Sequence, residues 1–160
     1  MTELRDPAHQ VDPRARAMWT VECAAGAVVL VVAVVAGATF WTEYAARWWG
    51  VALVAAGAVA YVIGVPRWRY LVHRWEITDT AVYTQRGWWA RERRIAPMSR
   101  VQTVDYAQGP LARLFGLATL TVTTASAAGA LQIDGLDRAQ ALALVDQLTL
   151  RAEDAGGDAT

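Results

Sequence analysis

Residues 20–41 read TVECAAGAVVLVVAVVAGATFW, and residues 48–65 read WWGVALVAAGAVAYVIGV. A helix rises about 1.5 Å per residue, so about twenty apolar residues cross a hydrocarbon core roughly 30 Å thick. The first segment meets this length and the second is near its lower limit. Between residues 20 and 65 the charged side chains are Glu22, Glu43 and Arg47. The sequence therefore predicts two transmembrane helices, 20–41 and 48–65, joined by a short loop.

The placement of tryptophan and arginine supports this interpretation, because indoles prefer the headgroup level and arginine gathers on the cytoplasmic side. Five of the eight tryptophans flank the two segments, namely Trp19, Trp41, Trp48, Trp49 and Trp68. Three arginines precede the first segment and three follow the second, whereas the loop has one; these are Arg5, Arg14, Arg16, Arg67, Arg69, Arg74 and Arg47. We therefore expect a multi-pass protein of the cell membrane with both termini in the cytoplasm.

Small residues recur at every fourth position of the second segment, at Ala52, Ala56, Ala60 and Gly64. Residues four apart share one face of a helix, and small side chains there permit close approach of another helix. The stripe is predicted to pack against the first helix. Packing against a second copy of the chain is the alternative.

From Arg69 onward the chain has short apolar segments separated by turn residues, which is typical of β-strands. Six strands are predicted, over residues 70–78, 81–85, 88–96, 101–106, 118–124 and 130–133. Pro110 and Gly116 frame the sequence LARLF, as expected for a short helix. Its Leu114 and Phe115 are predicted to plug the β domain, with Arg113 pointing outward.

The chain is predicted to close with an amphipathic helix that ends near Arg151. Asp137 and Gln140 have the spacing of an N-cap and its partner, and apolar residues follow at helical intervals, at Ala141, Leu144, Val145 and Leu148. The expected order is a cytoplasmic segment 1–19, the membrane helices within 20–65, a cytoplasmic β domain 66–151 and a polar tail 152–160. The fold class is membrane α + β, in which a transmembrane hairpin precedes an antiparallel barrel or sheet capped by a C-terminal helix.

Residues 75–124 read WEITDTAVYTQRGWWARERRIAPMSRVQTVDYAQGPLARLFGLATLTVTT and resemble the bacterial pleckstrin-homology-like (PH-like) family of YdbS-like membrane proteins, formerly a domain of unknown function. The similarity is most specific over residues 99–125 and, with the paired apolar segments, extends over about residues 16–150. It implies a PH-like β-barrel capped by a C-terminal helix. The biochemical role of that family is poorly defined, so the resemblance informs the fold more than the function.

The sequence contains no motif of an enzyme that we recognise. There is no nucleophile elbow, phosphate-binding loop or zinc-protease motif, and the two histidines, His9 and His73, are far apart. The single cysteine, Cys23, lies in an apolar helix. Asp134 and Asp137 are three residues apart, but Asp137 is already expected to cap a helix. We predict a non-enzymatic protein without catalytic residues, metal or cofactor, and we interpret His73 as a strand residue near the membrane.

Charge is unevenly distributed although the net charge is +0. Residues 67–100 carry eight arginines and three acids, whereas residues 101–160 carry three arginines and seven acids. Basic residues beside a membrane attract anionic lipid. The candidate contacts with lipid or a partner are Arg67, Arg69, Arg86, Trp88, Trp89, Arg91, Arg93 and Arg94.

Two functions fit these features. The first is a binding or scaffolding module at the inner face of the cytoplasmic membrane, which docks to lipid headgroups or to a protein partner and not to nucleic acid. The second is a structural subunit of a larger oligomeric membrane assembly. The arginines alone do not separate lipid binding from a simpler role in setting the topology.

Overall fold

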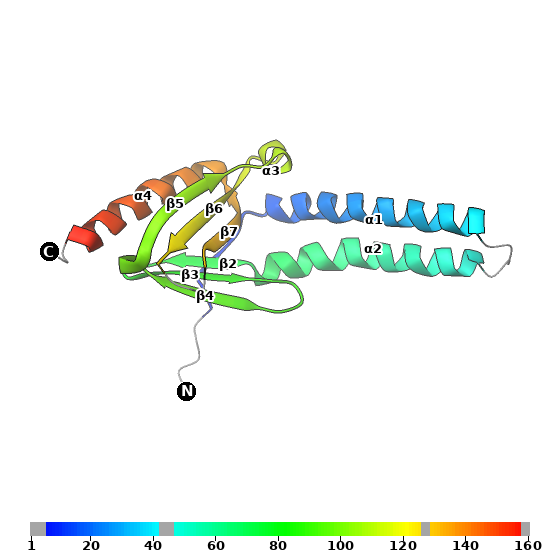
Figure 1. Cartoon of the computed structure of the whole chain (residues 1–160), viewed down its shortest axis with the longest axis horizontal. Coiled ribbons are helices and arrows are strands. Elements are labelled where there is room, and N and C mark those ends of the chain that lie inside the picture. The colour runs from blue at the N-terminus through cyan, green and yellow to red at the C-terminus, as the bar shows by residue number, and fades with distance from the viewer. Residues whose placement is uncertain (1–5, 42–46, 126–128, 158–160) are drawn as a thin grey trace, which may run out of the picture.

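The computed structural model describes residues 6–41, 47–125 and 129–157. Two long antiparallel helices, α1 (Arg14–Trp41) and α2 (Arg47–Val72), project from one end of a β domain (Figure 1). Both are long and apolar enough to cross a membrane, and the most apolar window of each is not buried inside the protein. On the side of the β domain, α1 begins six residues before its predicted membrane segment and α2 ends seven residues after its own.

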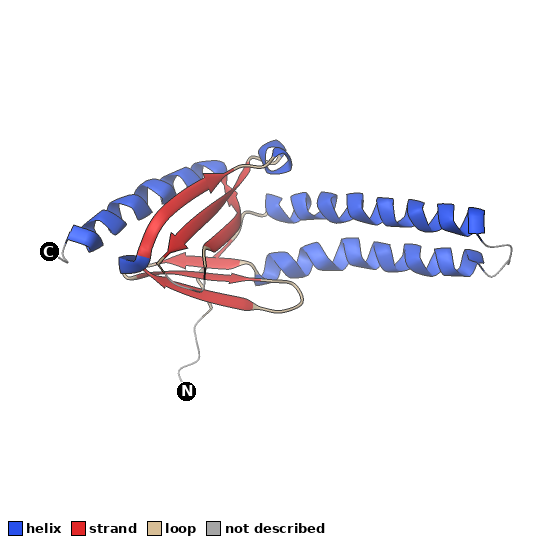
Figure 2. Ribbon diagram, viewed as in Figure 1, coloured by secondary structure: helices blue, strands red, loops and turns tan. Residues whose placement is uncertain are grey.

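The β domain consists of two antiparallel sheets and a covering helix (Figure 2). The first sheet has the order β1 (His9–Gln10), β2 (Arg74–Ile77), β3 (Ala81–Arg86) and β4 (Glu92–Pro97). After a short 3-10 helix, η1 (Met98–Arg100), the second sheet has the order β5 (Val101–Ala107), β6 (Leu117–Thr124) and β7 (Leu131–Asp137). The final helix, α4 (Arg138–Gly157), lies along the second sheet. The predicted fold class is confirmed.

Strand β1 precedes the membrane helices and was missed from the sequence. It pairs with β2 through His9 opposite Trp75 and Gln10 opposite Arg74. The helix hairpin is therefore inserted between the first two strands of the four-stranded sheet. A strand of two residues has too little periodicity to be recognised in a sequence.

The first turn of α1 is fixed to β7. The backbone N–H of Asp12 donates to the carbonyl oxygen of Gly135 at 2.9 Å. Gly135 has a φ of +74°, and a Cβ built on it would lie 2.6 Å from the Cβ of Ala15, so glycine is required for this close approach. Hydrogen bonds from the Arg14 guanidinium to Asp12 and Asp137 lower the pKa of both carboxyl groups. The helix that leads into the membrane thus starts as part of the β domain.

Two strand predictions were wrong at their first residues. The strand predicted over 70–78 begins at Arg74, because α2 continues through Pro66 to Val72. Val72, the last residue of α2, is 2% exposed, and its carbonyl oxygen accepts a hydrogen bond from Gln85 of the β domain. The strand predicted over 88–96 begins at Glu92, because residues 87–91 form the tip of the β3–β4 hairpin.

The short helix α3 (Pro110–Leu114) confirms one part of the predicted plug and contradicts another. Phe115 and Leu111 are partly buried and pack against the core, and Arg113 is exposed as expected. Leu114, however, is 83% exposed, because Leu111, four residues before Phe115, takes the inward position. Figure 1 shows α3 at the end of the domain nearest the helix pair.

The C-terminal helix has the predicted cap and the predicted buried face. Oδ1 of Asp137 accepts from the backbone N–H groups of Ala139 at 2.9 Å and Gln140 at 3.3 Å. Ala141, Leu144 and Leu148 are buried in the core, and the helix continues beyond Arg151 to Gly157.

Candidate membrane-docking surface

The β3–β4 hairpin ends in a tight tip, residues 87–91. Gly87 has a φ of +124°, and a Cβ built on it would lie only 1.8 Å from the carbonyl oxygen of Ala90. A side chain is therefore excluded at this turn. The two tryptophans that follow point away from the core, with Trp88 49% and Trp89 89% exposed.

The tip lies beside the end of α2 that adjoins the β domain (Figure 1). The Trp88 ring lies 6.4 Å from the ring of Tyr61, at right angles to it, and 6.1 Å from the ring of Trp89. The guanidinium carbon of Arg91 lies 5.7 Å from the ring centre of Trp68. Tyr61 belongs to the segment predicted to cross the membrane, so the tip lies level with the last turn of that segment.

Three of the candidate arginines form hydrogen bonds within the protein, namely Arg86, Arg93 and Arg94. Arg86 donates to Glu92 at 3.0 Å and to Gln132 at 3.1 Å. Arg94 donates to Glu92 and to the carbonyl oxygen of Ala130. Hydrogen bonds from Arg94 and Arg86 lower the pKa of Glu92. These bonds join the hairpin to its neighbours and hold its shape.

Arg93 completes this network on the other side of the hairpin. Its Nε donates to Oε1 of Gln85 at 2.8 Å, and its Nη2 pairs with Asp6. Gln85 in turn donates to the carbonyl oxygen of Val72 at 3.1 Å. The hairpin is thereby linked to the end of α2, which fixes the tip relative to the membrane helices.

Arg69 also faces inward, where it covers Trp19. Its guanidinium carbon lies 4.3 Å from the Trp19 ring centre, and its nitrogens lie 3.9 Å from both Glu22 and Asp134. Trp19 is 1% exposed, so the expectation that it marks the membrane interface was wrong; it is a core residue of the β domain.

His73 is a buried residue directly after α2 and not part of a strand, which corrects our interpretation. Its ring is 4.9 Å from that of Trp19, and its Nδ1 is 2.8 Å from the carbonyl oxygen of Arg69. Burial lowers the pKa of His73, which favours the neutral imidazole in the folded protein.

The remaining candidates are Arg67, Trp88, Trp89 and Arg91. Together with Trp68, which was not among the candidates, we call them the docking surface. Trp68 is 47% exposed beside the hairpin tip. Nη1 of Arg67 donates to the carbonyl oxygen of Ile63 at 2.8 Å. Within the described residues, neither Arg67 nor Arg91 has a carboxylate partner. Trp88, Trp89 and Arg91 thus lie at the hairpin tip, with Arg91 beside Trp68 of α2, and Arg67 is the residue before Trp68.

The small residues of α2 do not pack against α1. Ala52, Ala56, Ala60 and Gly64 are all exposed, and a Cβ built on Gly64 would meet no atom within 4 Å. The half-buried residues of α2 lie on a different face, at Val51, Val54, Ala55, Ala58, Val62 and Val65. The prediction of packing within the hairpin was wrong, because the spacing identifies a face but not its neighbour. Packing against a second copy stays a prediction.

Comparison with known proteins identifies the family of the chain. The family model described as bacterial PH domain matches residues 23–152. The chain is also similar to the transmembrane protein YdbS of Bacillus subtilis (strain 168), with 30% identity over 139 residues, which cover 82% of this chain and 87% of the relative. No solved structure matches the chain.

Proposed function

The chain belongs to the bacterial PH domain family, in its membrane-anchored form, and from this premise we propose that it is a non-enzymatic binding module whose docking surface holds the PH-like domain against anionic lipid at the inner face of the cytoplasmic membrane. The basic and aromatic side chains of the surface have separate tasks. Trp88 and Trp89 seat at the headgroup level, since indoles combine an apolar ring with one hydrogen-bond donor. Arg91 and Arg67 attract lipid phosphates.

The contact between Trp88 and Tyr61 carries this proposal. It joins the tip of a hairpin in the β domain to a residue of the predicted membrane segment. Once α2 crosses the bilayer, a side chain beside Tyr61 lies at the boundary of the headgroups. The ring of Trp89, which is 89% exposed beside Trp88, then faces lipid on its open side.

The proposal places both termini in the cytoplasm and the loop between the helices outside. The loop position Thr42 lies outside the described residues. In a Cys23→Ala background, a cysteine at position 42 is expected to react with a membrane-impermeant thiol reagent in intact cells. A cysteine at position 160 is expected to react only after lysis. Labelling of position 160 but not of position 42 in intact cells would mean that the topology is inverted.

Docking of the tip is expected to slow amide hydrogen exchange in residues 87–91 when the full chain is placed in nanodiscs that contain anionic lipid. Each basic residue near an anionic surface contributes about 1 kcal/mol, which corresponds to about a fivefold change. Arg91→Gln should therefore reduce the protection about fivefold, and the added changes Trp88→Ala and Trp89→Ala should remove it. High salt should weaken it as well.

A matched control for Arg91→Gln is Arg100→Gln, which removes the same charge from an exposed position at the other end of the hairpin. It should leave the exchange of residues 87–91 unchanged. Equal protection in neutral and anionic nanodiscs, or equal effects of the two arginine variants, would contradict docking to anionic lipid. These experiments need the full chain, because β1 and Trp19 belong to the β domain.

A structural subunit of an oligomeric assembly is the second candidate function. The small residues of α2 favour it, because four of them lie exposed on one face of a helix. Light scattering of the detergent-solubilised protein separates the two: a discrete oligomer that Ala56→Leu dissociates supports the subunit, whereas a monomer supports the membrane-docked module.

A further inference from the structure

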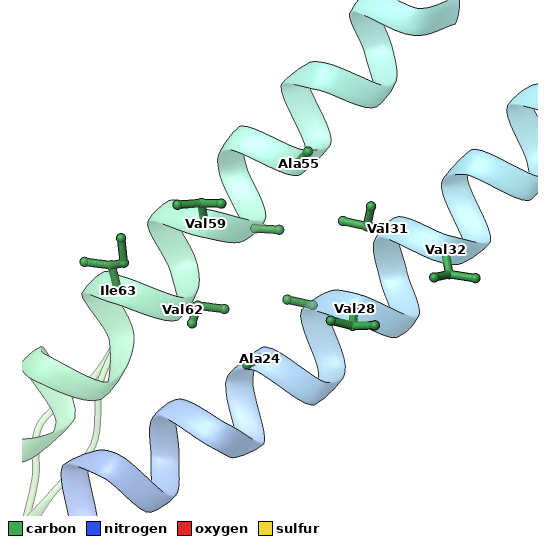
Figure 3. Close-up of a pocket in the computed structure, with 10 residues that line it drawn as sticks. Ala24, Val28, Val31, Val32, Ala55, Val59, Val62 and Ile63 are labelled. Atoms are coloured by element: carbon green, nitrogen blue, oxygen red, sulfur yellow. The ribbon is translucent and has the colours of Figure 1, made fainter.

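Two cavities lie between α1 and α2, and they share residues. One has a volume of about 370 Å³ and only apolar lining residues, from Ala24 to Val32 on α1 and from Ala55 to Ile63 on α2 (Figure 3). The other has a volume of about 400 Å³ and is lined by Arg16, Ala17, Thr20, Val62, Ile63 and Arg67. Val62 and Ile63 belong to both, so the cavities form one groove that is apolar at one end and basic at the other.

The two ends of the groove match the levels of the bilayer. Arg16 lies four residues before the first predicted membrane segment, and Arg67 lies two residues after the second. Both are therefore at the headgroup level on the side of the β domain. The apolar part extends over nine residues of each helix. The first and last of these are separated by a rise of roughly 12 Å, which is most of one leaflet of a hydrocarbon core roughly 30 Å thick.

The charges of Arg16 and Arg67 indicate what kind of molecule occupies the basic end of the groove. Arg16 and Arg67 have no carboxylate partner within the described residues, and no acidic residue lines either cavity. The two acids nearest to Arg16 in sequence are engaged elsewhere: Asp12 pairs with Arg14, and Glu22 lines a different cavity with Arg69. A helix from a second copy would bring the same pair of arginines and leave them unneutralised. A lipid phosphate between the two guanidinium groups supplies one negative charge and accepts charge-assisted hydrogen bonds from both.

We propose that this groove binds one anionic phospholipid of the cytoplasmic leaflet, with its phosphate between Arg16 and Arg67 and one acyl chain along Val62, Ile63 and the apolar cavity. This site is separate from the docking surface at the hairpin tip, although Arg67 borders both. The lipid is then a bound component of the helix pair, because its acyl chain fills the space that the side chains of α1 and α2 leave open.

Native mass spectrometry of the full chain in detergent, with dioleoylphosphatidylglycerol or dioleoylphosphatidylcholine added, tests the proposal. One phosphatidylglycerol is expected to bind more tightly than phosphatidylcholine. Arg16→Gln with Arg67→Gln should weaken its binding about thirtyfold, the effect of losing two basic residues near a phosphate. Arg100→Gln with Arg138→Gln is the matched control, since both are exposed and neither lines the groove; it should leave binding unchanged.

A second pair of variants tests the acyl-chain part without changing charge. Ala58→Phe fills the apolar cavity and should abolish the one-lipid adduct, whereas Ala60→Phe, on an exposed position two residues away, should not. Equal binding of the two lipids, or an unchanged preference in the Arg16 and Arg67 variant, would overturn the proposal. So would a lipid-free dimer that Ala58→Phe dissociates.

The hairpin variant Trp88→Ala, Trp89→Ala, Arg91→Gln distinguishes this site from the docking surface. It should leave the one-lipid adduct intact even where it abolishes docking of the tip. If that variant abolishes the adduct while the Arg16 and Arg67 variant retains it, the lipid binds at the tip and the groove does not hold it.

Discussion

Trp19→Ala is expected to destabilise the β domain by about 3–5 kcal/mol, the usual loss for a fully buried large aromatic side chain. Trp19 is 1% exposed and lies between Arg69 and His73 in the core. Because natural domains have a free energy of unfolding of only about 5–15 kcal/mol, a loss of this size unfolds a substantial fraction of the protein. Urea unfolding of the detergent-solubilised chain, followed by near-ultraviolet circular dichroism, measures it.

The matched control is Trp89→Ala, which removes the same side chain from a position that is 89% exposed. It should change the free energy of unfolding in detergent by less than about 0.5 kcal/mol. A similar loss from both variants would mean that Trp19 does not belong to the core and that α1 is not built into the β domain.

Leu148→Ala is expected to lower the free energy of unfolding by about 2–5 kcal/mol, because it leaves a cavity under α4. Leu148 is 0% exposed where α4 covers the second sheet. Leu150→Ala is the control in the same helix, since Leu150 is 63% exposed, and its effect should stay below about 1 kcal/mol. A reversed order of the two losses would show that α4 presents another face to the sheet.

The strongest local signals in the sequence predicted the fold well. Two long apolar segments, the cap at Asp137 and the periodicity through Leu148 each depend on neighbouring residues alone, so they could be read without knowledge of the tertiary structure. Strand β1 could not, because its two residues are defined by pairing with β2, which lies more than sixty residues away in the chain.

The candidate site was harder to predict, because a sequence shows residue types and not their partners. Trp19 stands at the edge of an apolar segment, where an interfacial tryptophan and a core tryptophan look alike. The arginines of the hairpin look equivalent, yet Arg86 binds Glu92 inside the domain while Arg91 stacks near Trp68. The sequence shows that these arginines are close together in the chain, but it does not separate those that form hydrogen bonds within the domain from Arg91.

The depth of the hairpin tip in the bilayer tests the proposed docking most directly. A spin label is attached at position 89 through Trp89→Cys in a Cys23→Ala background, and the chain is placed in nanodiscs with anionic lipid. The collision rate of the spin label with oxygen, which concentrates in the membrane, is compared with its collision rate with a water-soluble nickel chelate. The reference label is at Thr80, an exposed residue at the opposite end of β3.

We expect the label at position 89 to collide preferentially with oxygen and the label at position 80 with the chelate. A label at position 89 that is as accessible to the chelate as the one at position 80 would contradict docking and show that the tip lies in water.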